Sequence, residues 1–465
     1  MERIPAPALE LAQHFAAEGG ELALVGGPVR DLILGREVGD LDFATNLPPD
    51  RSLAALRHWA RKTWELGRAY GTVAGRRDGV IVEVTTYRTE AYEPDSRKPA
   101  VSYGETLEGD LTRRDFTINA MAVALAPEIR FVDPHGGLAD LAAQVLRTPA
   151  PATQSFDDDP LRMMRAARFA ATLGFDVAEA TLTAMSAMAD RLEIVSQERI
   201  QAELAKLILA PAPRRGLELL VYTGIADLIL PELPALQLAV DSAHHHKDVY
   251  EHSLTVLERA IAMETGPDGP VPKPDLVLRL AALLHDIGKP ATRRFEPGGQ
   301  VSFHHHEVVG AKLAARRLRA LRFDTATIRD VTRLIELHMR FHGYGDGAWS
   351  DSAVRRYVTD AGPLLERLHR LARADCTTQN SRRAERLAFA YDDLERRAAE
   401  LAEQEELKAI RPDLNGDQIM AILRIGPGKD VGRAYRFLLD LRMEQGPLGE
   451  AAAADALRTW WAAQL

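Results

Sequence analysis

The stretch LVGGPVRDLILGREVGDLDFAT, residues 24–45, decides the fold of the N-terminal part of the chain. The apolar run ELALVGG at 21–27 is typical of a strand, PVRDLILG at 28–35 of a short helix, and DLDFAT at 40–45 of a second strand. Further on, VIVEVTTYR at 80–88 predicts a third strand. Strands interleaved with a helix predict an α/β head with a mixed sheet.

The pattern changes after TPAPATQSFDDDP at 148–160, from which point it is helical almost without interruption. Proline and glycine interrupt the apolar period again near residues 231–247 and 264–275. We therefore predict an α/β part over 1–148 and three mostly α-helical parts over 149–235, 236–390 and 391–465.

Composition limits the setting of the protein. The chain has 465 residues and a net charge of −9, so a nucleic-acid partner would have to bind local arginine clusters. The N-terminus lacks the unbroken apolar core of a signal peptide, and the most apolar later run contains charged residues. The single cysteine, Cys376, cannot form an intrachain disulfide. We expect a cytoplasmic protein without a membrane span.

Two carboxylates stand close together in the second predicted strand. Asp40 and Asp42 are two residues apart, so on a strand both project from one face. Such crowding is costly unless a cation lies between the acids, and oxygen ligands favour Mg²⁺ or Mn²⁺. The alternative is a pair of solvated turn residues. Glu83, in the middle of VIVEVTTYR, is either turned to water or part of the same metal site.

The glycine pair has two interpretations as well. Gly26 and Gly27 lie between a strand and a helix, where a backbone without side chains can approach a phosphate and where a helix N-terminus presents N–H groups. The alternative is an ordinary tight strand-to-helix turn.

A second set of polar residues follows in the helical part. Imidazole and carboxylate groups recur in helical contexts that can fold back on one another, and together they suit a divalent transition metal or Mg²⁺. The set is His252, His285, Asp286, His306, His338 and Asp375. We expect His244, His245, His246, His304 and His305 to be mostly exposed residues at helix starts.

Five elements, in order, resemble the bacterial class II tRNA nucleotidyltransferases and poly(A) polymerases. They are GGPVRDLILGREVGDLDFAT (26–45), RRDFTINAMA (113–122), DPHGGLADL (133–141), DDPLRMMRAARFA (158–170) and SQERIQAEL (196–204). The adjacent His-Asp pair in LAALLHDIGKP resembles the HD phosphohydrolase superfamily. The resemblance implies a nucleotidyltransferase head at 1–148, a helical neck at 149–235, an HD domain at 236–390 and a helical RNA-binding tail at 391–465.

The resemblance also implies roles for single residues. Asp40 and Asp42 would carry two Mg²⁺ ions in the head, and Glu83 would help to activate the 3′-hydroxyl of an RNA. The HD residues would bind a divalent metal of unknown identity. The residues expected to bind the nucleotide are Gly26, Gly27, Arg30, Arg113, Arg114, Asp115, Asn119, Asp159, Arg162, Arg165 and Arg168.

The arginines and the aspartate of RRDFTINAMA fit phosphate and sugar chemistry. Arg113 and Arg114 offer forked donors to phosphate or sugar oxygens, and Asp115 can accept from a ribose hydroxyl. The alternative is a structural Arg–Asp pair at a helix start.

Asp159 and Arg162 carry the prediction about base selection. Three residues apart, they would share one face of a helix. A carboxylate accepts hydrogen bonds and a guanidinium donates them, which matches the amino donor and ring acceptor of cytosine and adenine and mismatches uracil and guanine. The alternative for Asp159 is a helix cap. Arg165 and Arg168 would continue that face and either touch RNA or be solvated.

The last stretch joins two predicted helices through the glycine-rich IGPGKDVG. N–H groups after that loop, with Lys429 and Arg433 near, would hold an RNA phosphate. The alternative is a plain helix connection.

Taken with the resemblance, the motifs predict a template-independent RNA nucleotidyltransferase that builds or repairs the 3′-terminal CCA of tRNA from CTP and ATP. We infer no obligate protein partner. A poly(A) polymerase or an enzyme that adds only CC or only A would share the head motifs. A third possibility is an HD phosphohydrolase whose head is a degenerate RNA-binding module.

Overall fold

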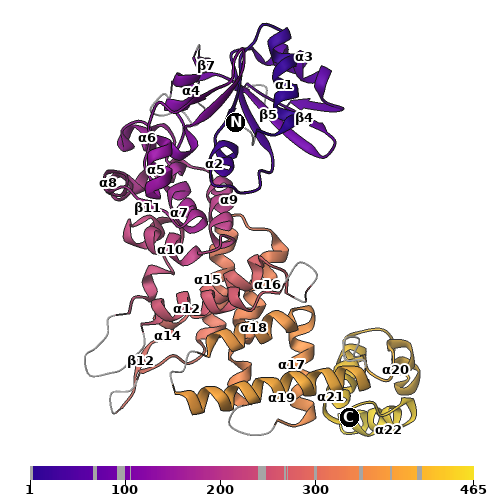
Figure 1. Cartoon of the computed structure of the whole chain (residues 1–465). Helices are drawn as coiled ribbons and strands as arrows, with labels where there is room; N and C mark the ends of the chain where they lie inside the picture. Colours follow the sequence, from indigo (N-terminus) through magenta and orange to yellow (C-terminus); the bar gives the residue numbers. More distant parts are fainter. Residues whose placement is uncertain are drawn as a thin grey trace. The chain divides into compact units, whose positions relative to one another are not determined.

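The computed structural model describes residues 4–65, 71–91, 100–104, 106–238, 248–265, 269, 271–297, 301–344, 349–376, 380–405 and 411–464 (Figure 1). The chain folds into two compact units, Met1–Pro231 and Glu232–Leu465. The α/β part and the first helical part lie in the first unit. The predicted boundary at 390/391 falls inside one helix, α19 (Ser381–Glu405).

A seven-stranded mixed sheet forms the head, in the order β3-β4-β5-β2-β1-β8-β9. Its strands are β1 (Leu22–Val25), β2 (Leu41–Thr45), β3 (Lys62–Glu65), β4 (Thr72–Arg77), β5 (Val80–Thr86), β8 (Ala122–Ala126) and β9 (Arg130–Val132). β2 and β5 pair in parallel and the other neighbours are antiparallel. A separate hairpin pairs β6 (Arg88–Ala91) with β7 (Ala100–Tyr103). The predicted mixed sheet is confirmed.

Helices cover the sheet. α1 (Ala6–Ala17) and α3 (Pro49–Trp59) pack against each other and against the sheet, side by side in Figure 1. α4 (Leu107–Thr112) packs on small residues of β1, β2 and β8 in one buried cluster. In β2, Ala44 belongs to that cluster, and the period of two places Asp42 on the same face as Ala44. The acids therefore stand on the α4 side of the sheet.

Three short helices lie within the head: α2 (Gly27–Ile33), η2 (Thr117–Asn119, before β8) and α5 (Gly137–Ala143). The helices that follow form the neck: α6 (Ala152–Asp158), α7 (Leu161–Leu173), α8 (Glu179–Ala187), η3 (Ala189–Ile194), α9 (Gln197–Ile208), α10 (Pro213–Tyr222) and α11 (Ile225–Ile229). The two-stranded pair β10 (Val145–Leu146) and β11 (Asp176–Val177) lies among them. α7 is the central element, since it contacts α9, α10 and α6 and buries nine of its residues.

The second unit is helical apart from the short pair β12 (Arg294–Phe295) and β13 (Val301–Ser302) in its described residues. Its helices are η4 (Pro234–Leu236), α12 (Val249–Ala262), α13 (Leu276–Leu284), α14 (Lys289–Thr292), α15 (His306–Ala320), α16 (Thr325–Leu337), η5 (His338–Gly343), α17 (Asp351–Ala361), η6 (Gly362–Leu364), α18 (Leu365–Asp375), α19, α20 (Gly416–Leu423), α21 (Lys429–Gln445) and α22 (Glu450–Ala462). α12, α13, α15, α16 and α18 pack around the HD residues, and α20–α22 share a separate core.

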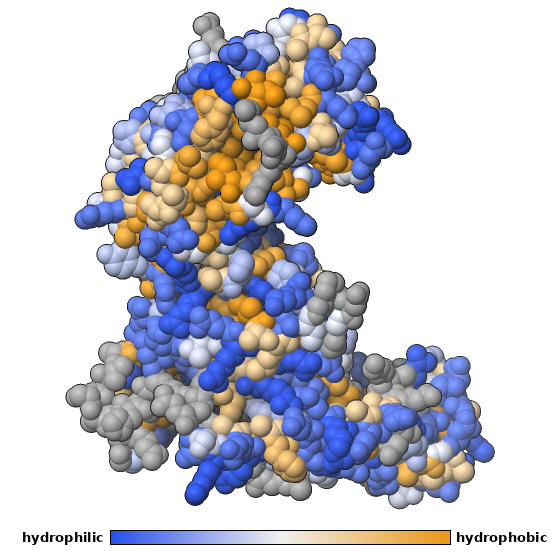
Figure 2. All heavy atoms as spheres, viewed as in Figure 1, coloured by the Kyte–Doolittle hydropathy of each residue, from blue (hydrophilic) through white to orange (hydrophobic). Residues whose placement is uncertain are grey.

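The two units differ in surface character. On the face drawn in Figure 2, apolar residues gather over the head and neck, whereas hydrophilic residues prevail over the helices of the second unit. Apolar side chains at a surface are ordinary, so the difference reflects composition and does not by itself mark a site. Among the described residues, no helix combines the length and the apolar character needed to cross a bilayer.

Candidate active site and metal centre

Sheet register brings two of the predicted acids together. In the parallel pair of β2 and β5, Asp42 is the register partner of Glu83, so the two side chains lie on one face of adjacent strands. Asp40 is the residue directly before β2, not a residue within it. The strand therefore aligns Asp42 with Glu83, and the bend before the strand brings Asp40 beside them.

The crowding of these acids alters Asp42. Partial enclosure by the sheet, followed by the nearby Glu83 carboxylate and a smaller effect of Asp40, raises the pKa of Asp42 to about 6, while Arg114 opposes the rise. Burial and like charge both disfavour the ionised form. A cation bound between the acids would remove this penalty, so the donor set fits a hard divalent ion.

The glycine turn begins α2. Gly26 has a φ of +74°, and a Cβ there would lie 2.9 Å from Arg114 Nη1. The positive φ therefore favours glycine at this turn, while the Arg114 guanidinium could shift to make room for a Cβ. Its N–H groups are less available than predicted, because Gly26 donates to Met121 O, Pro28 has no N–H, and Val29 and Arg30 both donate to Gly26 O.

Asp110, which the sequence analysis missed, fixes the two arginines of RRDFTINAMA. Asp110 is 1% exposed and accepts from Arg113 Nη2 at 2.9 Å and from Arg114 Nη2 at 3.1 Å. The pairing is structural, as the alternative stated, but it occurs at the C-terminal end of α4 and not at a helix start. Each arginine keeps 22% of its side chain exposed. Arg114 also lies close enough to Asp42 to lower its pKa.

Asp115 joins the head to the neck. Its carboxylate accepts from Phe116 N at 2.8 Å, Asn119 Nδ2 at 3.0 Å and Arg165 Nε at 2.8 Å. Burial alone would raise the pKa of Asp115, but Arg165 and these hydrogen bonds outweigh it and lower the pKa to about 2. Both carboxylate oxygens are thus engaged, and the predicted role of Asp115 as acceptor for a ribose hydroxyl would require one of them to be shared.

Arg30 and Arg168 extend the polar network around Asp115. Asn119 Oδ1 accepts from Arg30 Nη1 at 2.7 Å, and Arg30 is 8% exposed with its guanidinium near the Phe169 ring. Arg168 Nε donates to the buried Glu203 at 2.6 Å. Arg165 and Arg168 are therefore ion-paired to Asp115 and Glu203 and not simply solvated, and the alternative that they touch RNA stays a prediction.

The predicted shared helix of Asp159 and Arg162 is wrong. α6 ends at Asp158, Asp159 has extended angles of φ −146° and ψ 99°, and α7 begins at Leu161 after Pro160. A residue before proline is disfavoured in the helical region. Asp159 Oδ1 instead accepts from Leu161 N at 3.2 Å, as a cap does.

Arg162 is placed by buried contacts. Its guanidinium donates to Ser155 Oγ at 2.9 Å, to Ser155 O at 3.2 Å and to Arg113 O. The residue is 8% exposed. Backbone hydrogen bonding of Arg162 N to Asp159 O at 3.0 Å keeps the two residues adjacent although no helix contains both.

All six predicted HD residues come together. They form two groups whose ligand atoms lie within 4.8 Å of one another: His252, His285 and Asp375, and Asp286, His306 and His338. His252 Nε2 is 2.9 Å from Asp375 Oδ1, and His306 Nε2 is 3.3 Å from Asp286 Oδ1. Asp286 bridges the groups, since its Oδ2 lies 3.2 Å from His285 Nε2.

Backbone carbonyls hold three of the histidine rings at their Nδ1 atoms. Nδ1 of His285, His306 and His338 lies 2.8, 2.8 and 2.6 Å from the carbonyls of Ala282, Phe303 and Ile335. Such contacts fix the tautomer and turn Nε2 toward the centre, as in metal sites. His285 Nε2 is buried and has no hydrogen bond of good geometry. This donor set fits a divalent metal.

Charges inside the cluster are strongly coupled. Burial disfavours protonated His285, but Asp286 and Asp375 outweigh it and raise the pKa of His285 to about 10. Burial, helped by His285, lowers the pKa of His338 to about 4. Lys289, a further residue that the sequence analysis missed, lies 2.6 Å from Asp286 Oδ2.

Other predicted features lie apart from these centres. His304 and His305 are exposed and His305 caps α15, as expected, whereas His244, His245 and His246 lie outside the described residues. Lys429 begins α21, and Arg433 pairs with Asp430 at 3.3 Å. Whether that turn binds RNA or only joins helices stays a prediction.

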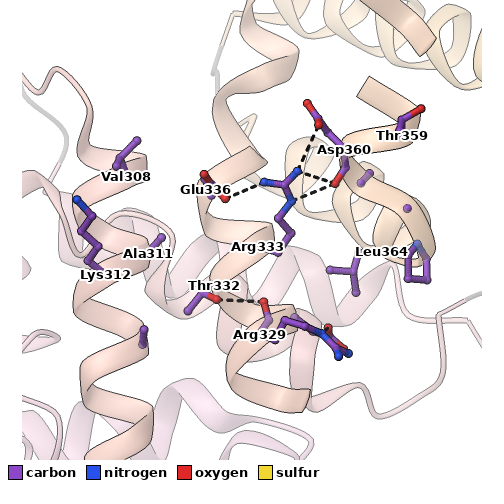
Figure 3. Close-up of a pocket in the computed structure, with 15 residues that line it drawn as sticks. Val308, Ala311, Lys312, Arg329, Thr332, Arg333, Glu336, Thr359, Asp360 and Leu364 are labelled. Carbon is purple, nitrogen blue, oxygen red and sulfur yellow. Dashed lines mark hydrogen bonds and ion pairs between the residues drawn. The ribbon is translucent and has the colours of Figure 1, made fainter. Parts of the chain in front are cut away.

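A cavity of about 800 Å³ lies beside α15, α16 and the end of α17 (Figure 3). Arg333 points into it and is held by Glu336 and the Asp360 carbonyl, the dashed contacts in Figure 3. None of the six HD residues lines this cavity. It is therefore separate from the metal centre.

Comparisons with known proteins define the class. Residues 22–147 match the model of the poly A polymerase head domain, 174–236 the probable RNA and SrmB-binding site of polymerase A, and 249–380 the HD domain. The chain is thus a nucleotidyltransferase with an HD domain.

Relatives define the family. An A-adding tRNA nucleotidyltransferase of Deinococcus radiodurans is 36% identical over 95% of both chains, and a CC-adding tRNA nucleotidyltransferase of Thermus thermophilus is 33% identical over 94% of this chain and 93% of its own. A CCA-adding enzyme of a Geobacillus strain is 42% identical over 49% of this chain and 54% of its own. A solved structure of the Bacillus stearothermophilus CCA-adding enzyme with CTP has the same fold, with a TM-score of 0.68 and 24% identity over 99% of both chains. The chain belongs to the tRNA nucleotidyltransferase family.

Proposed function

We propose that this enzyme adds the 3′-terminal CCA, or the part of it that is absent, to tRNA from CTP and ATP. The observation that carries the proposal is the alignment of Asp42 with Glu83 on one sheet face, close to Arg114 and the Gly26 turn. The two carboxylates and the Arg114 guanidinium therefore lie close together, as phosphoryl transfer to a hydroxyl requires.

Each head residue has a distinct task. Asp40 and Asp42 would hold Mg²⁺, two ions in the arrangement that the family resemblance implies. When bound, such ions lower the pKa of an attacking hydroxyl and neutralise charge on the leaving pyrophosphate. Glu83 lies beside Asp42 to orient the 3′-hydroxyl of the tRNA. Arg113 and Arg114, fixed by Asp110, present the exposed parts of their guanidinium groups to the triphosphate.

Asp159 and Arg162 would select the base. Asp159 accepts from the amino group of cytosine or adenine, and Arg162 donates to the ring nitrogen. Three hydrogen bonds to protein acceptors orient the Arg162 guanidinium, which has five N–H groups in all. Asp159→Ala should reduce discrimination against UTP and GTP by about 2 kcal/mol while triphosphate binding changes less. Unchanged base preference would leave Asp159 as a cap only.

Addition of A alone or of CC alone is the second candidate. It is favoured by a specific observation, since two relatives that match nearly the whole chain are an A-adding and a CC-adding enzyme. The Geobacillus CCA-adding enzyme matches 49% of this chain and 54% of its own length.

One assay separates these activities. tRNAs that end before CCA, after C and after CC are incubated with CTP and ATP singly and together, and product length is read. Addition of all three nucleotides to the shortest tRNA supports the proposal. Extension of only the CC-ending tRNA by A, or arrest after CC, selects a partial activity, and long adenylate tails on unrelated RNA would select a polymerase.

We also propose that the six HD residues bind a divalent cation that supports phosphoester hydrolysis. The anchored imidazoles and the buried His285 Nε2 support this role. Elemental analysis of the purified protein, followed by hydrolysis assays with cyclic and monoester phosphates, tests it. Metal without hydrolysis on any phosphoester would make the centre structural.

A further inference from the structure

Asp159 lacks the support that a helix would give its side chain. It is the residue between α6 and α7, with extended backbone angles. A carboxylate on such a junction rotates about χ1 and χ2 unless other groups hold it. A residue that reads a base edge must keep its oxygens in one plane, so the partners of Asp159 decide its use.

Arg199 is the main partner. Its Nη2 lies 3.0 Å from Asp159 Oδ2 and 3.2 Å from Oδ1, so one nitrogen spans both oxygens. Arg199 itself is placed in the first turn of α9, where the Ser196 hydroxyl accepts from its backbone N–H at 3.4 Å. The only other contact of the Asp159 carboxylate that the described residues show is Leu161 N at 3.2 Å.

We propose that Arg199 is a positioning residue for base selection. It holds the Asp159 carboxylate in one orientation, so that a remaining lone pair accepts from the amino group of cytosine or adenine. This inference rests on the proposed base-reading role of Asp159.

The burial of the pair distinguishes it from an ordinary surface ion pair. Asp159 is 21% exposed while Arg199 is 54% exposed, so the acid is sheltered and the arginine closes over it from the solvent side. In the neighbouring pair of Arg191 and Asp157, 2.7 Å apart, the exposures are 31% and 67%, and the acid is the outer partner. In the pair of Arg199 and Asp159, the arginine restrains a sheltered carboxylate. In the pair of Arg191 and Asp157, the exposed carboxylate restrains an arginine.

Restraint matters because uracil and guanine present an acceptor where cytosine and adenine present the amino donor. A fixed carboxylate repels that acceptor, whereas a carboxylate free to rotate moves away and tolerates it. Loss of Arg199 should therefore admit wrong bases more than it hinders right ones.

The experiment compares Arg199→Ala, Arg199→Lys and Asp159→Ala in the full chain, with Arg191→Ala as the matched control. CTP and UTP compete for addition to a tRNA that lacks CCA, and KM and kcat are measured for each. Arg199→Ala should lower the CTP-to-UTP preference about tenfold, chiefly through a raised kcat/KM for UTP, with kcat/KM for CTP reduced less. Arg199→Lys should recover part of the preference, since it keeps the charge and one nitrogen donor but lacks the rigid planar guanidinium. Arg191→Ala should match the parent.

The double variant Asp159→Ala/Arg199→Ala should be no less selective than Asp159→Ala alone, because both changes act through one carboxylate. If Asp159→Ala keeps the parental preference, base reading by Asp159 is wrong. If Asp159→Ala loses preference and Arg199→Ala keeps it, Arg199 has no positioning role and base reading stands. An equal fall for CTP and UTP with a lowered melting temperature, relative to Arg191→Ala, would make Arg199 a fold residue only and overturn the inference.

Discussion

The two polar centres of this enzyme are held in opposite ways. The head acids come from two adjacent strands, and sheet register alone aligns Asp42 with Glu83. The HD ligands come from α12, α15, α18 and the turns after α13 and α16, and backbone carbonyls fix three of the imidazoles. One centre is open and made of oxygen ligands, and the other is enclosed and rich in nitrogen.

This difference indicates how each centre would bind a cation. The Asp42 side chain reaches the surface, and its pKa is raised first by partial enclosure of the carboxylate and then by the charges of Glu83 and Asp40. Such a site suits an ion that arrives with a triphosphate and leaves with pyrophosphate. His285 and Asp286 are 0% and 1% exposed, which suits an ion that stays. The predictions below test this contrast.

The largest effect is expected for Asp42→Ala. Nucleotide addition should fall by at least about a hundredfold, because the change removes a ligand from the ion that activates the hydroxyl. The fold should persist because the side chain is exposed. Single-turnover addition to a CC-ending tRNA and thermal unfolding measure the two properties. Near-parental addition by a folded variant would refute the assignment of the head site.

The double variant His285→Ala/Asp286→Ala should change the other centre alone. Bound metal and phosphohydrolysis should be lost and the free energy of unfolding should fall by about 3 kcal/mol, since the partly buried Lys289 loses its counter-charge. Nucleotide addition should remain largely intact.

Metal content, addition and hydrolysis are to be measured on the same preparation. A folded variant that loses addition together with hydrolysis would show that the two centres do not work separately. His305→Ala, an exposed histidine close in sequence to His306, serves as the control and should retain its metal.

Acid titration should reveal the buried carboxylate that joins head and neck. The pKa of Asp115 is lowered to about 2, so its stabilisation is present above the ordinary pKa near 3.8 and is lost as the pH falls toward 2. Between pH 4 and pH 2, the free energy of unfolding of Asp115→Asn should therefore fall by about 2 kcal/mol less than that of the parent. Chemical unfolding at pH 4, 3 and 2.5 measures it, and Asp157→Asn, exposed on the same unit, should follow the parent.

The smallest effect concerns the metal-free head. Because the pKa of Asp42 is raised to about 6, the folded state gains stability from its proton at low pH and loses it as pH rises from about 4 through 6. Asp42→Asn should thus be more stable than the parent at pH 8 without metal, by no more than about 1 kcal/mol after solvent screening. The gain should vanish at pH 3 and in excess Mg²⁺. Equal stability at pH 8 would mean that the acids do not strain the head.

Local patterns predicted three of the seven strands of the head sheet and the HD set. Alternation and apolar runs identified β1, β2 and β5, because a buried strand leaves that signature in a few consecutive residues. The six HD residues came together as predicted from their residue types and the family motif. Partners far apart in sequence left no such signal: Arg165 meets Asp115 at a separation of 50 residues, and Arg168 meets Glu203 at 35.

Some errors were avoidable. The three-residue spacing of Asp159 and Arg162 in DDDPLR predicts one helix face, but Pro160 already disfavours a helical Asp159. Asp110 precedes Arg113 and Arg114 by three and four residues, a spacing that pairs charges at a helix end. Arg199 and Glu203 lie in SQERIQAEL, but the sequence alone assigns them no role. Only the folded neck shows that Arg199 contacts Asp159 and that Glu203 contacts Arg168.

Pro160 has a thermodynamic consequence for ligand binding. A proline narrows the conformations of the residue before it in the unfolded chain as well as in the folded one, so the extended shape of Asp159 is largely set before any ligand arrives. The loss of backbone freedom at this position then belongs to folding and not to association. A nucleotide that meets Asp159 therefore keeps more of its contact energy as affinity than it would at a junction that orders only on binding.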